Sequence, residues 1–289
     1  MMMPDHTIGL IGIGLLGTAM AERLRHSGMQ VLGYDIADTR CQELGSSGGR
    51  VAQSAAQVAE ECPFVLLSLP HSGSVCEVVA ELPIQKMRNH IIIDTTTGDP
   101  ATSYQLAESL ESSGIGYVDA TVAGSSEQAR RGDIVVMAGG KPEIVEKSRW
   151  LLDQLAANVF EIGPAGSGAR MKLVVNLVLG LNRAVLAEGI SLAERCGLDT
   201  NMALEVLKAG AAYSAAMDTK GEKMVNGDFS PQARLAQHLK DVDLILQLAA
   251  QSKLTAPLSE THRLLLQKAV EQGYGDADNS AVIRAYRDA

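Results

Sequence analysis

Three glycines near the start of the chain have the spacing of a dinucleotide-binding turn. They form a G-x-G-x-x-G pattern that directly follows the apolar run 8–11 and opens a helical segment. The first glycine permits a tight turn, the second lets the backbone approach a pyrophosphate, and the third lets the helix pack closely on the strand. Backbone N–H groups and the helix dipole then hold the pyrophosphate. The predicted cofactor-binding turn comprises Gly12, Ile13, Gly14, Leu15, Leu16 and Gly17.

A carboxylate at the end of the second predicted strand completes this unit. Asp35 lies about 20 residues beyond Gly17, where an acidic side chain accepts hydrogen bonds from the adenosine ribose hydroxyls. It would repel a 2′-phosphate, so the sequence favours NAD over NADP, although the nearby Arg40 leaves NADP use open. Two alternatives remain: a strand-to-helix turn without a ligand, and a FAD site, for which the chain lacks the later segments of a large flavin domain.

A lysine and an asparagine further along the chain have the spacing for proton transfer and substrate positioning. Lys172 and Asn176 follow the breaker cluster 163–168 and are spaced i, i+4, so both side chains emerge on one face of a helix near its start. Both are costly on an apolar helix unless they face a polar cleft, which we expect between two domains. Desolvation there would lower the pKa of the lysine toward neutrality, which suits proton transfer. The alternative is a lysine that reaches solvent and an asparagine bonded to the backbone in a core.

The elements that must position these residues alternate in type over the first 160 residues. Short aliphatic runs alternate with longer amphipathic segments, which is typical of a parallel sheet with crossover helices. The predicted strands are residues 7–11, 30–34, 64–69, 90–94, 116–120, 134–138 and 158–161, and the predicted helices are residues 16–26, 100–112 and 142–155. The predicted fold class is α/β, with an N-terminal Rossmann-type doubly wound parallel sheet.

The pattern becomes helical after the breaker cluster, which predicts a Rossmann domain over 1–163 and an all-helical domain over 164–289. The segment 169–196 is a long, nearly all-round apolar helix that joins the two domains, and we expect it to be buried. All-round hydrophobicity also favours a homodimer or homotetramer. Further helices are expected over 201–209, 234–251 and 259–272, with Ser259 as an N-cap.

Composition excludes several classes of protein. The 289 residues carry a formal net charge of -9 without a dense Lys/Arg run, which argues against nucleic acid or an anionic membrane surface as a partner. Four cysteines show no metal-ligand spacing, so no metal site is expected and a reducing cytoplasm fits. We find no targeting segment and no run long enough to predict a transmembrane helix.

The chain resembles the β-hydroxyacid dehydrogenase family, which includes 3-hydroxyisobutyrate dehydrogenase and tartronate semialdehyde reductase. The resemblance runs nearly end to end. It rests on the glycine pattern, on Leu69-Pro70, on Asp94-Thr95-Thr96-Thr97 followed by Pro100, on Asp119-Ala120-Thr121-Val122-Ala123-Gly124-Ser125, on the G-x-G-x-x-x-K-x-x-x-N segment 166–176, and on Lys240-Asp241. Motifs in the family order are far more specific together than any one alone.

The resemblance implies a reaction and a role for each matched residue. It implies that an NAD(P)-dependent enzyme interconverts a small 3-hydroxy acid and its semialdehyde, with Lys172 as general acid/base. Asn176 would position the substrate, and the segment Ala123, Gly124 and Ser125 would bind its carboxylate. The further cofactor contacts implied are Leu69, Pro70, Thr97 and Lys240, although Lys240 taken alone reads as a solvated helix lysine.

Several residues depart from the family pattern. Ala123 stands where the family usually has Ser, Ser125 replaces a glycine, and Thr121 replaces the customary Pro. A different acidic group on the substrate, such as a sulfonate, or a bulkier substituent would fit these changes. A non-catalytic NAD-binding module that uses its helices for association is a further alternative, against which the retained Lys172 and Asn176 count.

Overall fold

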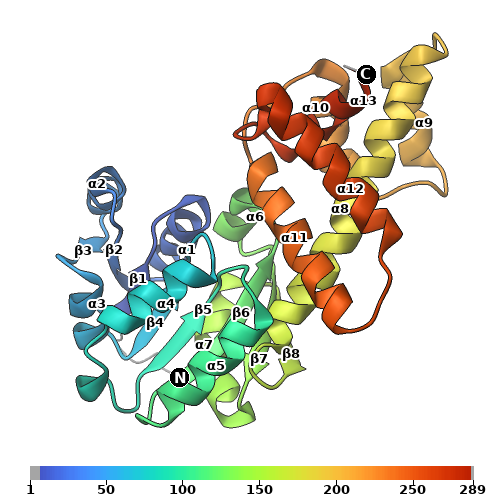
Figure 1. Ribbon diagram of the computed structural model, residues 1–289. Coiled ribbons are helices and arrows are strands. Elements are labelled where there is room, and N and C mark those ends of the chain that lie inside the picture. Colours follow the sequence, from blue (N-terminus) through green and yellow to red (C-terminus); the bar gives the residue numbers. More distant parts are fainter. Residues whose placement is uncertain (1–6, 288–289) are drawn as a thin grey trace. The chain divides into compact units, whose positions relative to one another are not determined.

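The computed structural model describes residues 7–287. They include an eight-stranded sheet in the order β3-β2-β1-β4-β5-β6-β7-β8 (Figure 1). Its strands are β1 (Thr7–Ile11), β2 (Gln30–Tyr34), β3 (Arg50–Val51), β4 (Phe64–Leu67), β5 (Ile91–Asp94), β6 (Gly116–Ala123), β7 (Val135–Gly140) and β8 (Asn158–Gly163). All seven predicted strands are present, with ends shifted by up to three residues, and only the two-residue β3 was not predicted.

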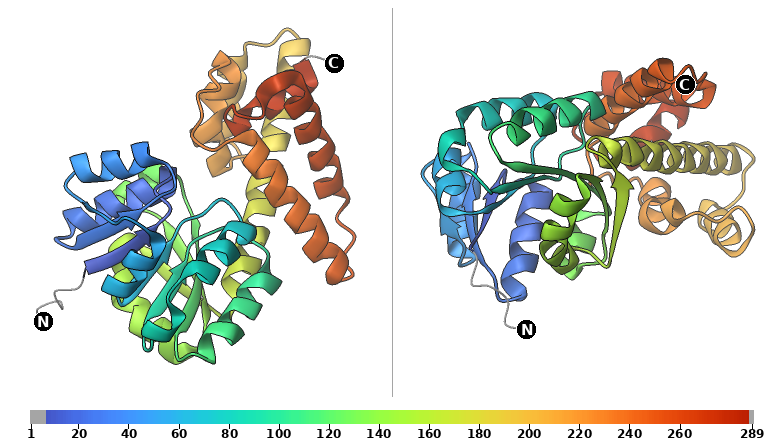
Figure 2. Two further views of the ribbon diagram at one scale, coloured as in Figure 1. Left: turned by 60° about the vertical axis from the view of Figure 1, so that its left-hand side comes forward. Right: turned by 90° about the horizontal axis from the view of Figure 1, so that it is seen from below.

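Helices cover both faces of this sheet, as Figure 2 shows. The helices of this unit are α1 (Leu15–His26), α2 (Asp38–Ser46), α3 (Ala55–Glu61), α4 (Ser72–Glu81), α5 (Pro100–Glu111), α6 (Ser126–Arg131) and α7 (Pro142–Leu155). Apolar residues of α1, α6 and α7 form one buried cluster with the strands, and those of α3, α4 and α5 form a second. The doubly wound α/β prediction is therefore confirmed, and burial from both sides explains the continuous apolar runs of the inner strands.

One strand pair departs from the predicted parallel arrangement. β6 and β7 pair antiparallel, from Val118 opposite Gly140 to Ala123 opposite Val135. The connection between them holds only the six-residue α6. A parallel crossover needs a dozen or more residues, so this short connection returns the chain antiparallel.

The chain divides into two compact units, one up to residue 172 and one from residue 173 onward, linked by the long helix α8 (Ser167–Arg195). The division falls inside α8, whereas the sequence prediction places the boundary after residue 163. The remaining helices are α9 (Thr200–Ala209), the π-helical turn η2 (Met217–Gly221), α10 (Glu222–Asn226), α11 (Leu235–Gln251), α12 (Pro257–Ala269), the π-helical turn η3 (Val270–Tyr274), the 3-10 turn η4 (Asn279–Ile283) and α13 (Arg284–Arg287). The prediction of Ser259 as an N-cap is wrong, because Pro257 begins α12 and Ser259 is buried within it.

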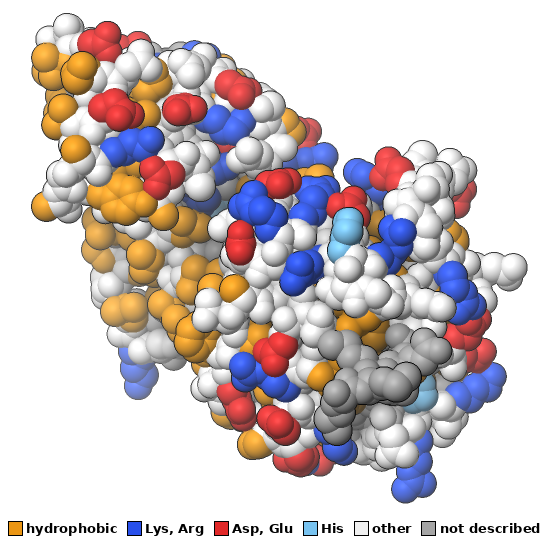
Figure 3. All heavy atoms as spheres, turned by 180° about the vertical axis from the view of Figure 1, so that it is seen from behind, with side chains coloured by type: hydrophobic (Ala, Val, Ile, Leu, Met, Phe, Trp, Pro, Cys, Tyr) orange, Lys and Arg blue, Asp and Glu red, His pale blue; other side chains and the backbone are white. Residues whose placement is uncertain are grey.

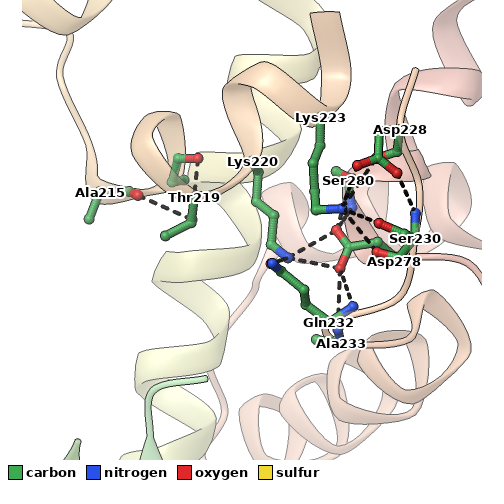
Figure 4. A network of polar contacts seen from close by, with 11 residues as sticks. Ala215, Thr219, Lys220, Lys223, Asp228, Ser230, Gln232, Ala233, Asp278 and Ser280 are labelled. Atoms are coloured by element: carbon green, nitrogen blue, oxygen red, sulfur yellow. Dashed lines mark hydrogen bonds and ion pairs between the residues drawn. The ribbon is translucent and has the colours of Figure 1, made fainter. Parts of the chain in front are cut away.

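A buried ion pair fixes the end of the helical unit. Asp278 is fully buried, and its carboxylate accepts hydrogen bonds from Lys220 Nζ at 2.8 and 2.9 Å and from Ser280 Oγ at 2.8 Å (Figure 4). The backbone N–H groups of Gln232 and Ala233 donate to it as well. A buried carboxylate is stable only when hydrogen-bonded in this way. The network therefore ties η2 to η4 and to the segment before α11.

The long helix α8 is not buried on all sides, which corrects the sequence expectation. Large apolar side chains along it are exposed, among them Val174 at 49%, Val178 at 53%, Val185 at 71% and Leu192 at 64%. Hydrophobic side chains gather on the helical unit in Figure 3. In the described residues α8 alone is long and apolar enough to cross a membrane, and 44% of its most apolar window is buried in the protein. The core helix of a soluble protein passes the same test of length and composition.

Candidate functional site

The turn between β1 and α1 has the geometry that a dinucleotide requires. Gly12 adopts a φ of +93°, and a Cβ there would collide with the carbonyl oxygen of Ser68. A Cβ at Gly17 would collide with the carbonyl oxygen of Gly12, so only glycine lets α1 begin so close to the strand. A Cβ at Gly14 would meet no heavy atom within 4 Å. Packing within the protein therefore does not require glycine at Gly14. The space beside its Cα is open, which fits the close approach of a phosphate.

Asp35 is held at this turn by backbone hydrogen bonds. Its Oδ2 accepts from the N–H of Ile13 at 2.6 Å and its Oδ1 from the N–H of Ala37 at 2.9 Å. The structure thus brings the predicted residues Ile13 and Asp35 into contact. Each carboxylate oxygen has a further lone pair, so the side chain can still accept from ribose hydroxyls. Arg40 forms an exposed ion pair with Glu43 at 2.9 Å.

The loop after β4 is fixed to the loop after β5. The N–H of Leu69 donates to Thr96 Oγ1 at 3.1 Å, and the N–H of Thr96 donates to Asp94 Oδ1 at 2.9 Å. Asp94 also accepts from the hydroxyl of Tyr117 at 2.8 Å, and burial raises the pKa of its carboxyl group. The adjoining predicted residues, exposed Pro70 and half-buried Thr97, therefore lie on two loops that share one hydrogen-bonded anchor.

Asp119 is a site residue that the sequence prediction did not include. It is 1% exposed, and its two carboxylate oxygens accept from the N–H groups of Gly166 and Ala169, both at 2.8 Å. Burial raises its pKa to about 7, and the charge of Asp94 on the neighbouring strand adds to the rise. The available signal was its place as an acid inside the apolar predicted strand 116–120, because a buried acid needs hydrogen-bond donors.

The segment predicted to bind the substrate carboxylate follows at the end of β6. Ala123 is half-buried, Gly124 is exposed and has a φ of +145°, and Ser125 caps α6. Ser125 Oγ accepts from the N–H of Gln128 at 3.2 Å, while its own N–H donates to Gln128 Oε1 at 2.9 Å. A substrate contact by the N–H of Ser125 thus requires exchange of that bond.

The predicted lysines and asparagine occupy α8 and α11. Lys172 is half-buried one helical turn before Asn176, which is 6% exposed. Asn176 Nδ2 donates to Asp241 Oδ2 at 2.9 Å, and Lys240 Nζ lies 3.2 Å from Asp241 Oδ1. Asp241 thus brings together Asn176 and Lys240, two residues far apart in the sequence. Lys240 is only 28% exposed along its side chain, unlike a fully solvated helix lysine.

The residues present fit a nicotinamide dinucleotide. The turn at Gly12 to Gly17 and Asp35 would hold its adenosine half, since a Cβ would fill the space beside the strand at two of the three glycines. Within residues 7–287, no group of three or more His, Cys, Asp or Glu is arranged to hold a metal ion.

Comparisons with known proteins agree with this geometry. Residues 7–163 match the family described as the NAD binding domain of 6-phosphogluconate dehydrogenase, and residues 166–286 match that of the NAD-binding region of NADP-dependent 3-hydroxyisobutyrate dehydrogenase. Glyoxylate/succinic semialdehyde reductase 1 of Arabidopsis thaliana is 30% identical over 97% of this chain and 98% of its own length. 2-Hydroxy-3-oxopropionate reductase of Escherichia coli is 29% identical over 96% of each chain.

A solved structure shares the whole fold. The crystal structure of 3-hydroxyisobutyrate dehydrogenase from Salmonella typhimurium has a TM-score of 0.90 and 26% identity, covering 97% of this chain and 99% of its own. The matches span both units and every predicted motif. The chain therefore belongs to the β-hydroxyacid dehydrogenase family of NAD(P)-dependent oxidoreductases, which interconvert hydroxy acids and semialdehydes.

Proposed function

We propose that Lys172 is the general acid/base in the interconversion of a small 3-hydroxy acid and its semialdehyde. The observation that carries this proposal is the grouping of polar residues on and around α8. Lys172 lies one turn from Asn176, whose amide is held by Asp241 beside Lys240. A buried asparagine oriented by a carboxylate presents its remaining amide groups in a fixed direction, as substrate positioning requires.

Each residue then has a defined task. In the reducing direction, the Lys172 ammonium donates a proton to the carbonyl oxygen of the substrate, and in oxidation the neutral amine accepts the proton of the hydroxyl. A bound nicotinamide supplies or takes up the hydride. Asn176 positions the substrate, and the segment Ala123, Gly124 and Ser125 receives its acidic group.

The remaining proposed contacts are with the cofactor. We propose that the glycine turn holds the pyrophosphate, that Asp35 favours NAD over NADP, and that Leu69, Pro70, Thr97 and Lys240 contact the nicotinamide half. The names of the two curated relatives both specify small carboxylates that bear an aldehyde. Ala123 in place of the usual serine removes a hydroxyl from the acid site, so we propose a substrate with a different acidic group, such as a sulfonate, or one with a bulkier substituent.

The test is a substrate screen followed by the absorbance of reduced nicotinamide. The panel contains small 3-hydroxy acids and their semialdehydes, with carboxylate, sulfonate and phosphonate versions of each. We expect the wild type to turn over at least one member of the panel. Lys172→Ala should lose about a thousandfold in kcat and retain NAD binding. Full turnover by Lys172→Ala would refute the general acid/base role. Inactivity of the wild type on the whole panel with intact NAD binding would favour a non-catalytic module.

We further propose a cytoplasmic homodimer or homotetramer without a nucleic-acid or membrane partner. The net charge of -9 disfavours an anionic partner surface. The exposed apolar side chains of α8, including Val178, Val185 and Leu192, form a stripe that a second copy of the chain would bury. Light scattering at micromolar concentration should show an oligomer, and Val185→Asp should shift it toward monomer. A monomeric wild type would contradict the proposal.

A further inference from the structure

Strand β6 presents two side chains to the start of α8. Asp119 and Thr121 lie on the same face of the strand, because side chains alternate with period two. The Asp119 carboxylate accepts from the N–H groups of Gly166 and Ala169, and Thr121 Oγ1 donates to the carbonyl oxygen of Gly168 at 2.8 Å. Both side chains are almost fully buried, at 1% and 0% exposure. One strand thus satisfies two backbone donors and one backbone acceptor at the start of the helix that carries Lys172.

Two glycines allow this contact to be so close. A Cβ at Gly168 would collide with the carbonyl oxygens of Asp119 and Met137. A Cβ at Gly139, on the neighbouring β7, would lie 2.6 Å from Asp119 Oδ1. The backbone of the helix start therefore rests directly on β6 and β7. A shift at Asp119 or Thr121 is therefore transmitted to the helix backbone.

We call the contacts of Asp119 and Thr121 with the start of α8 the clamp. One of them is made with the backbone carbonyl to which the N–H of Lys172 is bonded. In the α-helical ladder the carbonyl of Gly168 accepts from the N–H four residues later, which is that of Lys172. We infer that Asp119 and Thr121 are positioning residues for Lys172, which fix the helix turn from which its side chain extends. This inference rests on the proposed role of Lys172. Thr121 makes it specific to this chain, because the proline customary at that position has no hydroxyl to donate.

Thr121→Val tests the inference with little change in volume. It removes the hydroxyl and leaves the carbonyl of Gly168 without that donor, so we expect kcat to fall about tenfold from misplacement of Lys172, with the Kd for NAD unchanged. Thr121→Ser retains the hydroxyl and should restore kcat to within about twofold of the wild type. The primary deuterium isotope effect with deuterated reduced nicotinamide should rise in Thr121→Val, because the chemical step slows.

A matched control separates positioning from loss of stability. Ser148 is also fully buried, and its hydroxyl donates to the carbonyl of Ile144 at 2.9 Å in α7. Ser148→Ala should leave kcat and the isotope effect unchanged, and the melting temperatures of both variants are measured alongside. Equal effects of the two variants on kcat would overturn the inference, because a general loss of stability would then explain them.

A double-variant cycle distinguishes failure of this inference from failure of the proposed function. If Thr121 acts through Lys172, Thr121→Val should slow single-turnover hydride transfer in the wild type and cause no further loss in Lys172→Ala. An unchanged rate in Thr121→Val alone refutes the clamp and leaves the lysine role standing. Full activity of Lys172→Ala refutes the proposed function itself.

Asp119→Asn, which replaces one acceptor with a donor, should lower kcat about a hundredfold where it folds.

Discussion

Two glycine-containing turns connect a strand to a helix in this protein, and they use the same local chemistry for opposite purposes. The turn before α1 presents Gly14, whose Cβ position is open, and no side chain in residues 7–287 caps the helix there. The turn before α8 has its N–H groups at Gly166 and Ala169 satisfied by the carboxylate of Asp119. The first turn is therefore suited to an external anion, whereas the carboxyl group of Asp119 already occupies the second.

The difference shows that a glycine pattern alone does not specify a ligand site. Both turns need glycine where backbone meets backbone, at Gly12 and Gly17 in the first and at Gly168 in the second. What separates them is the presence of a buried acid within reach. Asp119 accepts hydrogen bonds from the N–H groups of the turn before α8. Within the described turn before α1, Asp35 accepts only from the N–H of Ile13, so the N–H groups at the start of α1 stay accessible.

The largest expected effect comes from filling the contact at the second turn. Gly168→Ala places a methyl group against the carbonyl oxygens of Asp119 and Met137, neither of which can move independently of β6 and β7. We expect the free energy of unfolding to fall by about 3 kcal/mol, as for overpacked cores. Chemical denaturation in the absence of cofactor measures this effect. A loss below about 1 kcal/mol would show that the helix start is not held rigidly on the strands.

A glycine-to-alanine substitution at the first turn should instead have little effect on stability and weaken NAD binding. Gly14→Ala meets no protein atom within 4 Å and its backbone φ of -72° suits alanine, so stability should fall by no more than about 1 kcal/mol, from the N-cap preference for glycine. The methyl group should obstruct the pyrophosphate and weaken NAD binding about thirtyfold, equivalent to about 2 kcal/mol. Fluorescence titration with NADH gives the Kd. Unchanged affinity would mean that the phosphates do not approach this residue.

A smaller effect should follow from neutralising Asp35. Asp35→Asn keeps an acceptor for the N–H of Ile13 and removes the charge that we expect to repel a 2′-phosphate. The ratio of kcat/KM for NAD to that for NADP should fall about fivefold, because a partly exposed charge pair contributes only about 1 kcal/mol. A wild type that already prefers NADP would contradict the assignment. Arg40→Ala is the matched variant, and it should lower use of NADP alone.

The sequence predicted the parts of this comparison that depend on local pattern. Strand-turn-helix periodicity located the turn at Gly12 to Gly17, and the breaker cluster located the start of α8. It did not predict that Asp119 would bind residues 47 and 50 positions later in the chain, since such contacts follow from the tertiary fold. The antiparallel β7 and the contact of Lys240 with Asn176 through Asp241 were missed for the same reason, because strand direction and helix packing depend on long-range contacts.

The smallest effect expected is a pH dependence at the second turn. Burial raises the pKa of Asp119 to about 7 from an ordinary value of 3.8, so between these values the folded protein keeps a proton that the unfolded chain releases. The stability contributed by this proton is complete below pH 3.8 and is lost as the pH rises through 7. From pH 6 to pH 8 the free energy of unfolding should fall by about 1 kcal/mol more in the wild type than in Asp119→Asn. Burial raises the pKa of Tyr117 well above its ordinary value of 10, so Tyr117 does not titrate between pH 6 and pH 8. Equal slopes would show that Asp119 does not titrate in this range.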